Sequence, residues 1–404
     1  MSQTSSSVHA TSHSRFAGWI VLLGALTALG PLSIDMYLPG LPDIAASLHA
    51  SDGSTQLTLA SYFIGLAIGQ MLYGPLSDHF GRKPPLLAGL AIYLLASLGC
   101  ALASSIDMLI GLRFLQALGG CAGMVIARAI VRDRCEPRHA AQVFSSLVLV
   151  MGVAPILAPL FGSWIVSLGG WRPIFVLLAL FALLCLLAMH RLLPESRPAR
   201  EDEPFRIGLT LRNYLALLRD RSFTGYAITG GLAVGGLFAY ITGSPIVLMK
   251  LYGLSASTYS LVFGSIATCY IVASQFNARF LKSNSLDTLL GRAIHVLAGA
   301  TVVLLLASLW GKPPVWLLLG CLYAYLGALG FVAANATAGA LARNGEQAGL
   351  ASALMGTLQF SIATLGGVLL GLWHDGSLTP LASTLAVCGV GAWLCYRLGT
   401  HRLG

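Results

Sequence analysis

The sequence predicts an all-α polytopic membrane protein with twelve transmembrane helices, and three observations carry this prediction. Of the 404 residues, 56% are hydrophobic and only 10% are charged, whereas a soluble domain carries roughly 25% charged residues. The apolar residues fall into twelve runs of about the length that crosses a bilayer core as a helix. The basic residues are distributed unevenly among the segments between these runs. The surface of this chain therefore faces lipid.

The twelve runs can be placed on the sequence within a few residues. Pro and Gly occur inside several of them, which spanning helices tolerate because neighbouring helices satisfy the freed backbone groups. The runs are 16–38, 55–76, 85–103, 107–129, 141–166, 172–192, 222–247, 257–280, 290–309, 315–340, 348–372 and 379–397.

The distribution of basic residues predicts the orientation of these helices. If both termini are cytoplasmic, 20 of the 24 Lys and Arg residues lie in cytoplasmic segments, and external loops hold only Arg172, Lys250 and Lys312. Such an excess is what the positive-inside rule requires of an even number of spans. The net charge of +9 is then explained by topology and by contact with anionic membrane lipids, and it does not indicate a nucleic-acid partner.

The longest hydrophilic stretch lies near the midpoint and divides the chain into two halves. We expect a cytoplasmic tail over 1–15, a six-helix bundle over 16–192, a cytoplasmic linker with a short amphipathic piece over 193–221, a second six-helix bundle over 222–397 and a tail over 398–404. Transporters are commonly built from two such repeats, with a binding site between them near the midplane. Glycine pairs four residues apart predict close helix packing; they are Gly65/Gly69, Gly119/Gly123, Gly231/Gly235 and Gly367/Gly371.

The loop between the second and third spans, GPLSDHFGRKP, carries the sharpest local pattern. Gly74 permits close packing, Gly81 permits a tight turn, and Asp78, Arg82 and Lys83 place one acid and two bases on a short segment. These five residues are able to form a charge-assisted latch to neighbouring helices that holds one conformation and yields in another. A polar turn that merely obeys the positive-inside rule explains the same residues equally well.

Two charged residues lie inside apolar runs. Asp35 is the only one of fifteen acidic residues that lies inside a run and not at its first residue, and Arg113 is the only basic residue clearly inside a span. Because charges in the bilayer are costly, each is a functional candidate. Both lie near the outer ends of their helices, so we expect them to meet within the first half, with Asp35 binding a proton and Arg113 tuning its pKa. The alternative is an Asp35 at the membrane interface with Arg113 as a static pair or cap.

Other polar and aromatic residues in the runs are candidates for the wall of a substrate cavity, although interhelical hydrogen bonds would also account for them. They are Met36, Tyr37, Tyr62, Gln116, Tyr240, Asn335 and Gln359.

Several strings resemble one known family. GPLSDHFGRKP resembles the signature loop of the major facilitator superfamily, with His79 where a basic residue is usual, and RFLQALGG (113–120) resembles its span-4 motif. GVAPILAPLFGS, which contains Gly152, Pro155, Pro159 and Gly162, is similar to the span-5 motif of drug/proton antiporters. PLSIDMYLPGLP (31–42) and the segment 54–78 resemble the Bcr/CflA (bicyclomycin and chloramphenicol resistance) branch of these antiporters.

The resemblance implies a monomeric transporter of the cell inner membrane that expels a small amphiphilic drug or metabolite in exchange for H⁺, without a cofactor. A proton-coupled exporter or importer of a small metabolite, such as an amino acid or a sugar, remains the alternative. An enzyme is not expected, because the sequence has no HExxH, Walker A, GxSxG or CxxC pattern, and no metal site is predicted.

Overall fold

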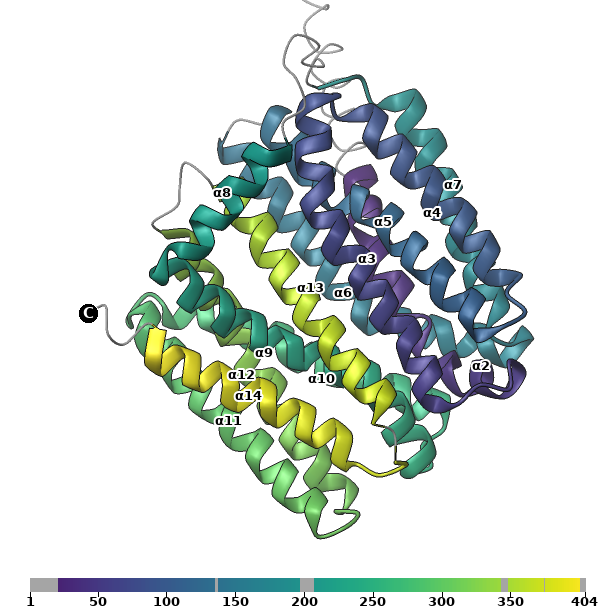
Figure 1. Ribbon diagram of the computed structural model, residues 1–404, viewed down its shortest axis with the longest axis vertical. Coiled ribbons are helices and arrows are strands. Elements are labelled where there is room, and N and C mark those ends of the chain that lie inside the picture. The colour runs from purple at the N-terminus through teal and green to yellow at the C-terminus, as the bar shows by residue number, and fades with distance from the viewer. Residues whose placement is uncertain (1–20, 135–136, 197–206, 343–347, 374, 400–404) are drawn as a thin grey trace, which may run out of the picture.

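The computed structural model describes residues 21–134, 137–196, 207–342, 348–373 and 375–399, and the regular elements in these ranges are all helices (Figure 1). Twelve helical segments are long and apolar enough to cross a membrane, which confirms the predicted number of spans. These segments are Val21–Ser47, Asp52–His79, Lys83–Ala101, Ile106–Arg134, Val150–Gly169, Arg172–Leu192, Arg221–Leu251, Ala256–Phe280, Leu286–Leu309, Val315–Ala342, Gly349–Leu372 and Thr379–Leu398.

The individual helices follow the spans closely, with short extra elements at three places. After the helical residues 21–35 they are η1 (Leu38–Gly40), α2 (Leu41–Ser47), α3 (Asp52–His79), α4 (Lys83–Ala101), α5 (Ile106–Arg134), α6 (Pro137–Gly169), α7 (Arg172–Leu192), α8 (Ile207–Arg219), α9 (Arg221–Pro245), the π-helical η2 (Ile246–Leu251), α10 (Ala256–Phe280), α11 (Leu286–Leu309), α12 (Val315–Ala342), α13 (Ala348–Leu372) and α14 (Thr379–Gly399).

The first span is longer than its apolar run and is broken. Its regular helix stops after residue 35, and the chain then passes through η1 into α2. Pro39 and Pro42 stand in the first turns of η1 and α2, where a missing backbone N–H costs nothing. The expected end of the run near residue 38 is therefore the site of a break, and the span continues to Ser47.

Small residues allow close helix contacts in the first half, as the glycine spacing predicts. A Cβ atom at Gly65 would lie 2.5 Å from the backbone oxygen of Phe114, and one at Gly69 would lie 2.5 Å from the Cβ of Cys121. These contacts join α3 to α5. Gly119 approaches the backbone oxygen of Gly89 in the same way and joins α5 to α4.

The two halves meet along two pairs of helices. In Figure 1, α3 of the first half and α13 of the second lie side by side. Their backbones are close, because a Cβ added at Gly53 would press on Gly371 and one added at Gly367 would press on Ala60. On a second line of contact, α6 packs against α10. At the end where α3 begins, which the sequence predicts to be external, Lys250 forms an ion pair with Asp52. The halves are therefore fastened together at this end.

A short helix lies in the segment between the halves. This helix, α8, contacts α9 and α13, and its residues Tyr214 and Leu217 are buried while Leu215 and Leu218 are exposed. An amphipathic piece was expected in this part of the linker. The limits of the tails, halves and linker remain predictions. The tail over 1–15, part of the linker (197–206) and residues 400–404 of the tail over 398–404 lie outside the described residues.

Candidate functional site

Asp35 ends the regular helix of the first span, and its side chain is buried. Only 3% of the residue is exposed. Within the part of the chain that the structure describes, no hydrogen bond or ion pair engages its carboxyl group. An ionised carboxylate is expensive to remove from water without a partner. A proton is the simplest partner that would satisfy this group.

The break after Asp35 brings the second half of the protein to this carboxyl group. The short helix η1 contacts α6, α9 and α10. Asp35 lies near enough to the hydroxyls of Tyr240 on α9 and Tyr259 on α10 to act on them electrostatically. The residue is thus placed where the two halves meet, although the sequence placed it within the first half alone.

The two tyrosines differ in how their hydroxyl groups are satisfied. Ser244 lies beside both, but its hydroxyl is hydrogen-bonded to the hydroxyl of Tyr259, at 3.2 Å. Tyr240 stacks on Phe263 with 5.5 Å between the ring centres. Its own hydroxyl is buried and has no hydrogen-bond partner among the described residues. A buried polar group of this kind calls for an explanation; Asp35 lies within electrostatic reach of this hydroxyl but is not hydrogen-bonded to it in this structure.

Arg113 is fully buried and is held by aromatic rings. Its guanidinium carbon lies 4.7 Å from the ring centre of Tyr37 and 4.2 Å from that of Tyr62, which is a favourable distance for a cation over an aromatic face. Its Nη1 donates a hydrogen bond of 2.6 Å to Gln116, whose amide nitrogen donates one of 2.8 Å to Ser97. Nε and Nη2 have no partner in the described chain.

Asp35 and Arg113 form no ion pair in this structure, although the sequence led us to expect that they meet. Tyr62 is the residue that relates them, because both charges lie near enough to act on its hydroxyl. The π-face of this ring is a partner for the guanidinium, and it replaces the carboxylate that charge alone would select. Arg113 is therefore a cation held by aromatic rings, and Tyr62 lies within electrostatic reach of both Arg113 and Asp35.

The span-5 motif residues lie along the contact between α6 and its neighbours. A Cβ at Gly162 would overlap the backbone oxygen of Met36, so this glycine lets α6 reach the turn that follows Asp35. The backbone oxygen of Pro159 accepts a hydrogen bond of 2.9 Å from Ser260 on α10. Gly152 on α6 faces Ile271 on α10. Pro155 lies inside α6.

The remaining cavity candidates are partly explained by structural contacts. The hydroxyl of Tyr37 is hydrogen-bonded to Thr58 at 2.7 Å. Asn335 exchanges two hydrogen bonds with Asn277, of 2.8 and 3.2 Å, and so joins α12 to α10. Met36 is buried and Gln359 is half-buried. The sequence did not identify an aromatic cluster across the halves, in which Phe238 lies 4.7 Å from Phe63 and 5.3 Å from Phe360 between ring centres.

The predicted latch is a network centred on Arg82. Its Nη1 donates to Asp78 at 2.7 Å, and its Nε donates to Asp133 on α5 at 2.7 Å. Burial acts to lower the pKa of Arg82, but hydrogen bonds and charge interactions with Asp133 and Asp78 outweigh it, so the pKa is raised overall. Gly81 has a φ of +84°, which glycine adopts without strain.

The same loop is also tied to the residues that follow α7. The carboxylate of Glu195 accepts hydrogen bonds from the backbone N–H groups of Arg82 and Lys83, at 2.8 and 2.9 Å. The side chain of Lys83 donates to the backbone oxygen of His190 at 2.7 Å. These contacts join the first half to Glu195, which lies at the start of the predicted linker. Gly74 has open space around its Cα, because a Cβ added there would have no neighbour within 4 Å. The loop thus joins α3, α4 and α5 to the end of α7.

Comparisons with known proteins agree with this architecture. Residues 23–398 match the model of the Major Facilitator Superfamily. The chain is 37% identical over 386 residues to the uncharacterized MFS-type transporter YdgK of Bacillus subtilis (strain 168), covering 95% of this chain and 96% of the relative. It is 32% identical over 386 residues, with the same coverage, to the bicyclomycin resistance protein homolog of Haemophilus influenzae (strain ATCC 51907 / DSM 11121 / KW20 / Rd).

A solved structure shows the same fold at low sequence identity. The bacterial homolog of the human lysosomal transporter Spinster, in an inward-facing and occupied conformation, aligns with a TM-score of 0.72 and 16% identity over 95% of this chain and 96% of its own. The solved structure shows the fold alone. The family match over nearly the whole length and the twelve candidate spans show a multi-pass inner-membrane secondary transporter and not an enzyme. The chain belongs to the Major Facilitator Superfamily, in the branch that contains the bicyclomycin resistance proteins.

Proposed function

We propose that this protein exports small amphiphilic drugs or metabolites in exchange for protons, and that Asp35 is the residue that binds the proton. The observation that carries the proposal is a buried carboxyl group without a hydrogen-bond or ion-pair partner among the described residues, placed where the two halves meet. The similarity to a bicyclomycin resistance protein homolog supports a drug as the substrate.

The position of Asp35 couples its charge to the movement of the halves. When the halves close around it, water leaves and the protonated form is favoured; when they part on one side, the carboxyl group is hydrated and can release its proton. A polar or cationic substrate that enters the same space would stabilise the carboxylate and so compete with the proton. Exposure of Asp35 first to one side of the membrane and then to the other exchanges a proton for a substrate molecule.

Arg113 acts as a positioning residue in this proposal. Tyr37 and Tyr62 hold its guanidinium at a fixed place near Asp35, so a change in the distance between the two charges as the halves rock would change the free energy of ionisation. Tyr240 would offer the carboxylate a hydrogen-bond donor from the second half. The aromatic cluster of Phe63, Phe238 and Phe360 offers apolar surface of the kind that binds varied drug-sized ligands.

The remaining features follow from the same mechanism. The ion gradient supplies the energy, so no cofactor is required, and the chain works as a monomer surrounded by membrane lipids. The loop around Arg82 would hold α3, α4, α5 and the end of α7 together as one moving body.

The test is transport in everted membrane vesicles with bicyclomycin as the first probe. An antiporter accumulates the drug when the lumen is acidified and releases it when ΔpH collapses, whereas an importer of the same compound shows no such accumulation. Asp35→Asn should remove ΔpH-driven accumulation while leaving folded protein in the membrane. The matched control is Asp43→Asn, which removes an exposed carboxyl group eight positions further along the same span. Undiminished coupling in Asp35→Asn would refute the assignment.

A further inference from the structure

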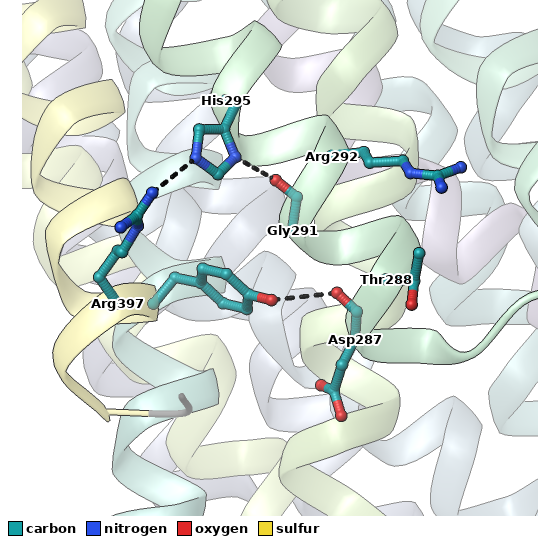
Figure 2. Close-up of a pocket in the computed structure, with 7 residues that line it drawn as sticks. Asp287, Thr288, Gly291, Arg292, His295 and Arg397 are labelled. Carbon is teal, nitrogen blue, oxygen red and sulfur yellow. Dashed lines mark hydrogen bonds between the residues drawn. The ribbon is translucent and has the colours of Figure 1, made fainter. Parts of the chain in front are cut away.

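A shallow cavity of 330 Å³ opens between α11 and α14, far from Asp35 in the fold. It lies at the start of α11 and the end of α14, which the distribution of basic residues predicts to be cytoplasmic. Figure 2 shows the side chains that line it, which are Asp287, Thr288, Gly291, Arg292, His295, Tyr396 and Arg397.

One cation of this cavity is held in place without being neutralised. The Nδ1 of His295 lies 2.6 Å from the backbone oxygen of Gly291, and its Nε2 lies 3.4 Å from Nη2 of Arg397. A carbonyl oxygen only accepts, so Nδ1 carries the proton, and Nε2 is then free to accept from the guanidinium. The guanidinium also lies 5.2 Å from the ring centre of Trp393. Histidine and tryptophan thus orient Arg397 and leave its charge intact.

A second cation, Arg292, reaches out on the opposite side of the cavity (Figure 2). Both arginines are exposed, and within the described ranges neither forms an ion pair with an acid. The one acid of the cavity, Asp287, accepts a hydrogen bond of 2.6 Å from the hydroxyl of Tyr226. Its carboxylate points away from His295 and Arg397 in Figure 2. The cavity therefore holds two guanidinium groups and one carboxylate, so its net charge is positive.

The surface adjoining these charges is apolar. Val296 lies four positions after Arg292 on α11, and Leu394 lies three positions before Arg397 on α14, so each shares a helix face with its arginine. Val296 and Leu394 are 53% and 45% exposed. Tryptophan is enriched at the level of the lipid head groups, and Trp393 lies beside Arg397.

We propose that this groove binds an anionic phospholipid, with the head-group phosphate at Arg397, an acyl chain along Val296 and Leu394, and Arg292 adding positive charge on the opposite side of the cavity. Basic pockets between membrane helices on the cytoplasmic side suit anionic head groups, and guanidinium groups are well matched to phosphate. The hydroxyl of Thr288 on the same wall is available as a further donor to the phosphate. A zwitterionic lipid lacks the net charge that the two arginines select.

The experiment is native mass spectrometry of the purified full-length protein in a neutral detergent. Phosphatidylglycerol, phosphatidylcholine with the same acyl chains, and inorganic phosphate are titrated separately. The test variant is R292Q/R397Q. The matched control is R279Q/K282Q, which removes two cations from another shallow surface cavity lined by α10 and the residues after it.

We expect wild type to prefer phosphatidylglycerol and R292Q/R397Q to bind it about 25-fold more weakly, because each basic residue contributes about 1 kcal/mol near a charged surface and 1.4 kcal/mol is a factor of ten. R279Q/K282Q should stay within about twofold of wild type, because its charges lie outside the groove. If the double variant does not fold, R292Q and R397Q alone should each weaken binding by about fivefold.

Three results would overturn the proposal. Equal loss in the test and control variants would mean that any surface cation serves. Equal binding of phosphatidylcholine would remove the role of the phosphate charge. Displacement of phosphatidylglycerol by inorganic phosphate alone would assign the site to a free anion instead of a lipid. None of these outcomes bears on Asp35, so the result is independent of the proposed transport mechanism.

Discussion

The guanidinium of Arg113 lies 4.2 Å from the centre of the Tyr62 ring, in a buried stack beside the turn that carries Asp35. This relationship places a positive charge near the proposed proton site without an ion pair to bind it there. The charge state of Asp35 can then change without breaking a salt bridge.

Replacing Arg113 should impair transport more than it impairs folding. In Arg113→Lys the charge is kept, but the planar stack on Tyr37 and Tyr62 is lost. A buried cation–π interaction is worth about 2 kcal/mol, so we expect ΔpH-driven transport to fall by about tenfold or more. Arg113→Met should abolish it. Transport and membrane-protein yield measured together check this, and wild-type transport in Arg113→Met would rule out a role for the charge.

Removing the hydroxyl of Tyr240 should affect function and not stability. This hydroxyl is buried without a hydrogen-bond partner among the described residues, so Tyr240→Phe should leave the melting temperature unchanged or slightly raised while reducing transport. The control is Tyr325→Phe, because the Tyr325 hydroxyl donates a 2.7 Å hydrogen bond to the backbone oxygen of Ala233. That variant should lose about 1 kcal/mol of stability and retain transport. The reverse pattern would contradict the assigned roles.

Alanine substitutions should distinguish a glycine that is needed for close helix packing from one that is not. Gly162→Ala would push a methyl group onto the backbone oxygen of Met36, and overpacking of this kind costs about 1 to 3 kcal/mol. We expect slower transport and a lower melting temperature. Gly74→Ala meets nothing within 4 Å and should keep or slightly raise the melting temperature. Lost transport in a stable Gly74→Ala protein would show that this glycine is needed in another conformation.

The network at Arg82 should be insensitive to alkaline pH. Burial acts against the charge of Arg82, but Asp133 and Asp78 raise its pKa above the ordinary value. A raised folded-state pKa stabilises the protein fully below the unfolded pKa, and the contribution is lost only as pH rises through the folded value. For arginine this loss lies above about pH 12. The difference in melting temperature between wild type and Arg82→Gln should therefore be constant from about pH 7 to about pH 9; a difference that shrinks over this interval would argue against a charged Arg82.

The number of spans and the close helix contacts could be predicted from the sequence because both depend on local patterns. The length of an apolar run determines whether it crosses a bilayer, and glycines four apart mark one face of a helix, as Gly65 and Gly69 do against α5. Asp35, Arg113 and Arg82 could be singled out for a similar reason, since a charge in or beside a span is conspicuous.

The partners of these charges could not be predicted, because they come from distant parts of the chain. Asp133 lies 51 positions from Arg82, and Glu195 lies 113 positions from it. Opposite charge suggested Asp35 as the partner of Arg113, whereas the structure uses aromatic faces that look like ordinary apolar positions in the sequence. Tyr259 comes within electrostatic reach of Asp35 only because the two halves pack together, and no local sequence pattern predicts how they pack.

The reciprocal amide contacts of Asn277 and Asn335 have a consequence for the behaviour of the second bundle. Amides do not ionise at any pH that a cell experiences. The contact between α10 and α12 therefore keeps the same hydrogen bonds whatever proton concentration the two sides of the membrane present.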